Sequence, residues 1–152
     1  MEIFPNLPSL IFHVVFSTRG QAPLITAEIG ILLYSYLDGL IQSEGGMVIE
    51  SGGMPDHIHL LASFSHEKSV EEMIQAIKSR SADWLNDKAG LEVPFGWQES
   101  YAVFSVSQVS AAEAMEHLRK QAEYHRHKSF EEEFIELLKE HGVDYDEDGL
   151  WD

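Results

Sequence analysis

Two histidines lie one residue apart in the stretch GGMPDHIHLLASF, residues 52–64, directly after a turn-forming segment. Successive side chains of a β-strand point to opposite faces, so residues i and i+2 share a face. His57 and His59 are therefore expected to project side by side. Neutral imidazoles bind divalent metal ions, and two on one face need only one or two further ligands. The alternative is that both are half-buried or solvent-facing residues without such a role.

The segment HLRKQAEYHRHKSF, residues 117–130, forms a second polar cluster that could supply the missing ligands. His117 and Gln121 are four residues apart, so they share one face of a helix. Tyr124 follows on nearly the same stripe. The remaining histidines are isolated on a strand or among charges, and no functional role is predicted for them: His13, His66, His125, His127 and His141.

Local patterns predict the elements that position these clusters. The strands are rich in β-branched and aromatic residues, and the helices carry apolar residues at helical spacing behind capping residues such as Thr26 and Ser69. Strands are expected at residues 9–18 and 101–107, with a hairpin at 47–64 around the turn Gly-Gly-Met-Pro-Asp. Helices are expected at residues 26–46, 69–90, about 110–125 and 129–141.

This succession of elements predicts an α+β fold. The order β-α-β-β-α-β-α is ferredoxin-like, with an antiparallel sheet of about four strands, helices on one face and an added C-terminal helix. A length of 152 residues is that of one domain, so residues 1–152 are expected to form a single unit.

Composition narrows the classes of protein. The absence of cysteine excludes a disulfide framework and a thiolate metal site. No stretch resembles a signal peptide or an apolar run of about 18 residues, so we expect a cytoplasmic protein without a membrane partner.

Charge is distributed unevenly along the chain. The net charge is −16, and residues 131–152 form an acidic tail with ten acidic residues and one basic residue. Such a charge argues against nonspecific binding to nucleic acid. Basic residues elsewhere either decorate the surface or contact phosphates near the site, and the candidates for DNA contacts are Arg19, Lys78, Arg80, Arg119 and Lys120.

Taken in order, the motifs resemble the IS200/IS605-type single-tyrosine transposases, including the repeat-associated tyrosine transposases, of the HUH (His-hydrophobic-His) class. The resemblance rests on FHVVFSTRGQAPLI, GGMPDHIHLLASF, SVEEMIQAIKSRSADWL, FGWQESYAVFSVS, HLRKQAEYHRHKSF and EEFIELLKEHGVDYDEDGLWD. It implies that His57, His59 and Gln121 hold Mg²⁺ or Mn²⁺, and that a tyrosine one turn before the glutamine attacks a DNA phosphodiester to leave a 5′-phosphotyrosine link. It also implies a single-stranded, hairpin-forming DNA partner and a homodimer.

The chain departs from this family at the nucleophile, because His117 occupies the position of the expected tyrosine. Three readings follow. The nucleophile is lost; or Tyr124 replaces it, although it would lie about 10 Å further along a continuous helix; or His117 acts as a further metal ligand or attacks phosphorus itself.

Two functions of other classes compete with a metal-dependent transposase that cleaves and rejoins single-stranded DNA. One is a domesticated DNA-binding or regulatory protein that does not cleave. The other is a small metal-binding protein whose dimer surface is its function.

Overall fold

Strands β1 (Ile11–Ser17) and β3 (His57–Ser63) form the centre of an antiparallel sheet, and both are almost completely buried. Strands β2 (Met47–Met54) and β4 (Ala102–Val106) flank them in the order β2-β3-β1-β4. The computed structural model describes residues 10–151, so position 9 of the first predicted strand and both ends of the predicted domain lie outside the described residues. The predicted α+β, ferredoxin-like fold is confirmed.

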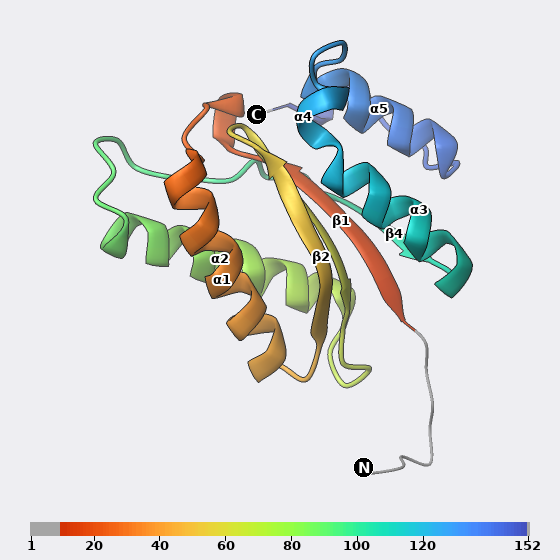
Figure 1. Ribbon diagram of the computed structural model, residues 1–152, viewed down its shortest axis with the longest axis horizontal. Coiled ribbons are helices and arrows are strands. Elements are labelled where there is room, and N and C mark those ends of the chain that lie inside the picture. Colours follow the sequence, from red (N-terminus) through yellow and green to blue (C-terminus); the bar gives the residue numbers. More distant parts are fainter. Residues whose placement is uncertain (1–9, 152) are drawn as a thin grey trace.

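Helices cover both faces of this sheet (Figure 1). Helices α1 (Ala27–Ser43) and α2 (Val70–Lys88) pack on the face that carries Phe16, Ile58 and Leu60. Helices α3 (Gln108–Arg119), α4 (Gln121–Tyr124) and α5 (Phe130–Glu140) pack on the opposite face. Because side chains alternate along β3, its odd-numbered residues, including both histidines, face α3 to α5. Short 3₁₀ turns occupy Arg19–Gln21 and Glu147–Gly149.

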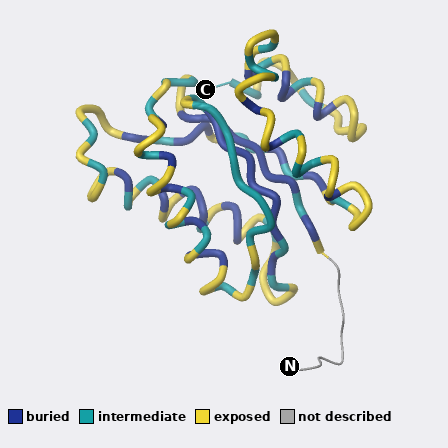
Figure 2. The backbone as a smooth tube through the Cα atoms, viewed as in Figure 1, coloured by how far each residue is buried: buried dark blue, intermediate teal, exposed yellow. Residues whose placement is uncertain are grey.

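Burial follows this layering, since the central strands β1 and β3 are buried, edge strand β2 is partly exposed, and the outer faces of the helices are exposed (Figure 2). No helix within residues 10–151 is long and apolar enough to cross a membrane.

The hairpin is tighter than the sequence predicts. Strand β2 continues through Met54, so only Pro55 and Asp56 connect it to β3, and the predicted five-residue turn is wrong. Gly52 pairs with His59 inside the ladder. A Cβ atom at Gly52 would lie 3.0 Å from the carbonyl oxygen of Leu118. The glycine therefore lets the end of α3 approach β2 closely, next to the histidines.

The predicted helix at about 110–125 is also corrected, because it breaks. Helix α3 ends at Arg119, Lys120 leaves helical geometry with φ −101° and ψ 20°, and α4 is a separate short helix. Our displacement of about 10 Å for Tyr124 assumed a continuous helix, so it does not apply.

Helix α5 closes the second layer. Ser129 and Glu132 form a reciprocal capping box at its start. Its buried stripe contains four apolar residues and one acid: Phe130, Glu133, Phe134, Leu137 and Leu138. The capping box and stripe fix which side of α5 faces the sheet, and that side carries Glu133.

Candidate metal centre

His57 and His59 are fully buried on the same face of β3, and their ring centroids lie 5.2 Å apart. On the neighbouring strand, His13 places Nε2 at 2.8 Å from Nδ1 of His59. Both β3 histidines direct Nε2 toward the Oε1 atom of Glu133 in α5, at 3.2 Å for His57 and 2.8 Å for His59. The Glu133 carboxylate of α5 therefore contacts both histidines of β3, and His13 of β1 adjoins them.

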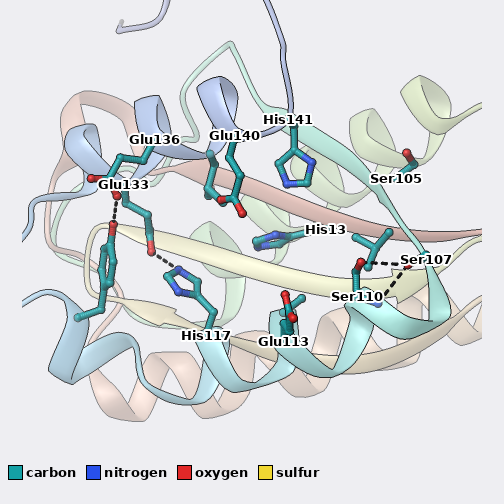
Figure 3. Close-up of a pocket in the computed structure, with 14 residues that line it drawn as sticks. His13, Ser105, Ser107, Ser110, Glu113, His117, Glu133, Glu136, Glu140 and His141 are labelled. Atoms are coloured by element: carbon teal, nitrogen blue, oxygen red, sulfur yellow. Dashed lines mark hydrogen bonds and ion pairs between the residues drawn. The ribbon is translucent and has the colours of Figure 1, made fainter.

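Three further side chains contact Glu133 from α3, α4 and the residue after α4. Nε2 of His117 lies 2.8 Å from Oε2 of Glu133 (Figure 3). Gln121 donates from its amide nitrogen to the same oxygen at 2.9 Å. His125 places Nε2 at 3.3 Å from Oε1 of Glu133. Since Glu133 is only 1% exposed, these imidazoles and the amide are its immediate surroundings.

Hydrogen bonds outside this cluster fix the tautomers of two imidazoles. Nδ1 of His57 donates to the Asp56 carboxylate at 2.7 Å, and Nδ1 of His125 donates to the Lys128 carbonyl at 2.7 Å. In their neutral forms, both rings therefore direct an Nε2 lone pair inward. The inward neighbours are Oε1 of Gln121, at 3.0 and 3.1 Å, and the Glu133 carboxylate. Lone pairs converge here, so the arrangement requires a cation or added protons.

Electrostatics agree with that requirement. Burial lowers the pKa of His57, but its hydrogen bonds with Asp56 and Glu133 outweigh burial and raise the pKa to about 9. Burial lowers the pKa of His59 to about 4 and that of His13 to about 3. Burial alone would raise the pKa of Glu133, but hydrogen bonds from the imidazoles hold that pKa well below its usual range. The centre thus holds an anionic carboxylate, with positive charge favoured on His57 and disfavoured on His59 and His13.

The spacing of the donor atoms fits a divalent metal ion. Ligands about 2.1 Å from an ion and at right angles to each other lie about 3 Å apart. The separations between donor atoms given above span 2.8–3.3 Å. Two triads, His57-His125-Glu133 and His59-His117-Glu133, each bring their donor atoms within 4.8 Å of one another. Asp56 and the Lys128 carbonyl are the outer acceptors that commonly orient metal-bound imidazoles.

The structure brings together all four residues that the sequence linked to this centre: His57, His59, His117 and Gln121. It adds three that sequence reasoning missed, namely His13, His125 and Glu133, and the first two are histidines for which we predicted no functional role. Signals existed. His125 follows Gln121 by four residues, and Glu133 lies on the apolar stripe of its helix.

A cleft of about 670 Å³ leads to the centre between α3, β4 and α5 (Figure 3). Its wall carries four carboxylates, from Glu113, Glu133, Glu136 and Glu140. Tyr124 also lines it, with its ring centroid 4.9 Å from that of His117. The Tyr124 hydroxyl donates to Glu136 at 2.7 Å, and burial together with this carboxylate raises the pKa of the phenol. The cleft therefore suits cations better than phosphates.

The five basic candidates for DNA contacts separate into two groups. Lys78 and Arg80 belong to α2, on the opposite layer from the centre. Lys78 is buried and donates to the Glu99 carbonyl at 2.8 Å, and Arg80 pairs with Glu44. These positions do not favour contact with DNA bound at the centre.

The other three basic residues lie close in sequence to residues of the centre or beyond the end of the strand that pairs with it. Arg119 and Lys120 directly precede Gln121; both are exposed, and they pair with Glu50 and Glu116. Arg19 is exposed just beyond the end of β1, where Ser17 pairs with His57.

Comparison with known proteins identifies related sequences and folds. Residues 6–121 match the family model described as "Transposase IS200 like". Over 115 residues the chain is 25% identical to the ISDra2 transposase TnpA of Deinococcus radiodurans, a match that covers 72% of this chain and 82% of that protein. The family match ends at Gln121, so His125 and Glu133 lie beyond it.

Two solved structures share the fold. One, from Deinococcus radiodurans and assigned as a transposase, has a TM-score of 0.63 and 21% identity, covering 80% of this chain and 97% of that chain. The other is a REP-associated tyrosine transposase bound to a REP hairpin, with a TM-score of 0.59 and 9% identity, covering 82% of this chain and 74% of that chain.

Proposed function

Because the chain belongs to the family of IS200-like transposases, we propose that it binds single-stranded DNA at a metal site, and that its cleavage and rejoining of DNA strands is impaired. The metal ligands carried over from the family are His57, His59 and Gln121, and the ion is Mg²⁺ or Mn²⁺. Bound there, the ion would polarise a scissile phosphate for in-line attack. The proposed DNA is a hairpin, which is what one structural relative holds.

A single observation carries the proposed impairment. The residue four positions before Gln121 is His117, and its Nε2 atom is held 2.8 Å from the Glu133 carboxylate. An imidazole engaged with a carboxylate is not a phenol available for attack on a phosphodiester. The chain thus keeps the residue types for metal binding while the phosphotyrosine step lacks its nucleophile.

The test is covalent capture of labelled single-stranded hairpin DNA in the presence of Mn²⁺, resolved on a denaturing gel. The wild type should form no adduct. His117→Tyr should form one, because the phenol would replace an imidazole that contacts Glu133 beside Gln121. DNA binding by the wild type, measured separately, should persist. If the wild type binds hairpin DNA and His117→Tyr still forms no adduct, a non-cleaving DNA-binding or regulatory role is favoured instead.

A second candidate is that Tyr124 has become the nucleophile. Its ring packs against His117 and it lines the cleft beside the centre, which brings it closer than a continuous helix would. Its hydrogen bond to Glu136 and its raised pKa oppose attack by the phenolate. An adduct formed by the wild type and eliminated by Tyr124→Phe would establish this candidate and contradict the first.

We also propose a cytoplasmic homodimer in which residues 1–152 act as one domain. Strand β4 is an edge strand of the sheet, with backbone groups to which a second copy could pair. Helices α3 and α4 already bring His117 and Gln121 to the histidines of the same chain, so dimerisation need not complete the centre. Light scattering at micromolar concentration should give twice the chain mass, and a monomer would contradict the dimer.

A further inference from the structure

We propose that Glu133 and His125 are ligands of the same metal ion as His57, His59 and Gln121, and that α5 thereby closes the site around a transition-metal ion before any DNA binds. This inference rests on the metal site of the proposed function. It assigns the ion two ligands from the part of the chain beyond the family match, which ends at residue 121.

Geometry places both residues among the donors. Oε1 of Glu133 lies 2.8 to 3.3 Å from Nε2 of three imidazoles, those of His57, His59 and His125. Oε1 of Gln121 lies 3.0 and 3.1 Å from Nε2 of His57 and His125. Glu133 is thus shared by two sets of donor atoms, one with His57, His125 and Gln121 and one with His59, and in the proposed site the ion draws both sets into one shell. His117 contacts the second oxygen of Glu133 and orients the carboxylate.

Hydrogen bonding explains why a cation belongs at this point. The amide nitrogen of Gln121 donates to Glu133, so the amide oxygen must face the imidazoles. Nδ1 of His125 donates its hydrogen to the carbonyl oxygen of Lys128. The Nε2 lone pair of the same imidazole therefore faces an oxygen of Gln121 and an oxygen of Glu133. Protonating several neighbouring buried imidazoles would place like charges together, which is costly. One divalent ion satisfies all of these lone pairs at once.

The position of Glu133 on α5 supports the same conclusion. It is the single acid on a buried stripe of apolar residues. A buried carboxylate costs free energy unless it is paired or coordinates a metal. A contact with the ion would attach α5 to the sheet, and the remaining cleft carboxylates, Glu113, Glu136 and Glu140, would attract cations to the entrance.

The donor set indicates the class of ion. Three imidazole nitrogens with two oxygens suit Mn²⁺, Co²⁺, Ni²⁺ or Zn²⁺ better than Mg²⁺, which prefers oxygen ligands and retains water. A shell with five protein donors should also hold its ion in the absence of DNA.

The experiment is calorimetric titration of the full-length chain, stripped of metal, with Mn²⁺, Zn²⁺ and Mg²⁺ in the absence of DNA. The wild type should bind one ion per chain, with Mn²⁺ and Zn²⁺ bound more tightly than Mg²⁺. Loss of an outer-sphere partner typically weakens metal binding about 10- to 100-fold, so Glu133→Gln and His125→Gln should each weaken Zn²⁺ binding by at least that much. Glu131→Gln, which removes a carboxylate from the same helix outside the cleft, is the matched control and should bind like the wild type.

A second measurement does not depend on the folding of the variants. X-ray absorption by the Zn²⁺-loaded wild type should count three imidazole ligands, whereas two would overturn the proposal. Wild-type affinity in Glu133→Gln or His125→Gln, or a preference for Mg²⁺, would also overturn it. None of these outcomes contradicts a metal site made of His57, His59 and Gln121 alone, so the proposed function would stand. The hairpin adduct assay tests DNA processing independently. A wild type that binds none of the three ions would overturn both proposals.

Discussion

At the scale of single residues, the carboxylate of Glu133 connects the predicted site residues with unpredicted ones. Its two oxygens contact four imidazoles and one amide. His117 is one of these partners, so the proposed substitution at the nucleophile position would do more than remove a phenol. It adds an imidazole that holds Glu133 in place, which links the proposed loss of cleavage to the proposed closure of the metal site.

Asp56 offers a residue-scale prediction. It accepts the Nδ1 hydrogen of His57 at 2.7 Å, which keeps Nε2 available to an ion. Asp56→Ala should weaken Mn²⁺ or Zn²⁺ binding about 10- to 100-fold, as loss of such outer partners typically does. Asp87→Ala, on the exposed surface of α2, is the control. Equal metal affinity of the two variants in calorimetry would show that Asp56 does not orient the ligand.

At the scale of elements, two local irregularities assemble the centre. The break at Lys120 turns the chain so that Gln121 and His125 both reach the histidines of β3. The glycine at position 52 leaves room for the end of α3 against β2. A continuous helix over a strand with larger side chains would hold His117 and Gln121 further from the sheet.

Gly52→Val should therefore destabilise the protein and weaken metal binding together. The new side chain meets the Leu118 carbonyl, and overpacking of this kind costs about 1–3 kcal/mol. Valine otherwise suits a strand, so a loss reflects this contact rather than strand propensity. Urea unfolding should show the decrease, whereas Gly39→Ala, with open space around its added Cβ, should not. An unchanged midpoint for Gly52→Val would contradict the close approach of α3.

At the scale of the whole molecule, the sheet separates two layers with different roles. One layer, α1 and α2, builds the larger apolar core, and Lys78 is part of its packing. The other layer carries the metal donors and the acidic cleft. With a net charge of −16, the proposed binding of DNA would depend on the proposed ion and on a few cations near it.

This separation into two layers predicts which basic side chain contributes to the affinity for DNA. Lys120→Gln should weaken hairpin binding and reduce the slope of log affinity against log salt by about 1, because one phosphate contact is lost. Arg80→Gln lies on the other layer and should leave both quantities unchanged. Fluorescence anisotropy across a salt series measures both the affinity and the salt slope. If Arg80→Gln weakened hairpin binding more than Lys120→Gln, the DNA would bind on the layer of α1 and α2, which contradicts this proposal.

Metal removal should destabilise the whole fold, since the proposed ion would join β3 to α4 and α5. An ion present at 100 times its dissociation constant stabilises a protein by about 2.7 kcal/mol. For a chain of this size, that corresponds to roughly 5–11 °C in Tm. Calorimetric melting of stripped and Zn²⁺-loaded protein should show the difference, and Glu133→Gln should lose most of it. Identical melting curves for loaded and stripped wild type would argue against a metal that holds the layers together.

The sequence by itself determined the order of elements, the shared face of His57 and His59, the helix near residues 129–141, and the departure at His117 from the family that its motifs resemble. These features depend on the side-chain periods of strands (2 residues) and helices (3.6 residues) and on helix capping, all of which are set by residues close together in the sequence. Only the tertiary structure decided that His13, His125 and Glu133 join the centre and that Lys78 is buried. The contact of His59 with Glu133 spans 74 positions, so it depends on how α5 packs on the sheet, which no local pattern specifies.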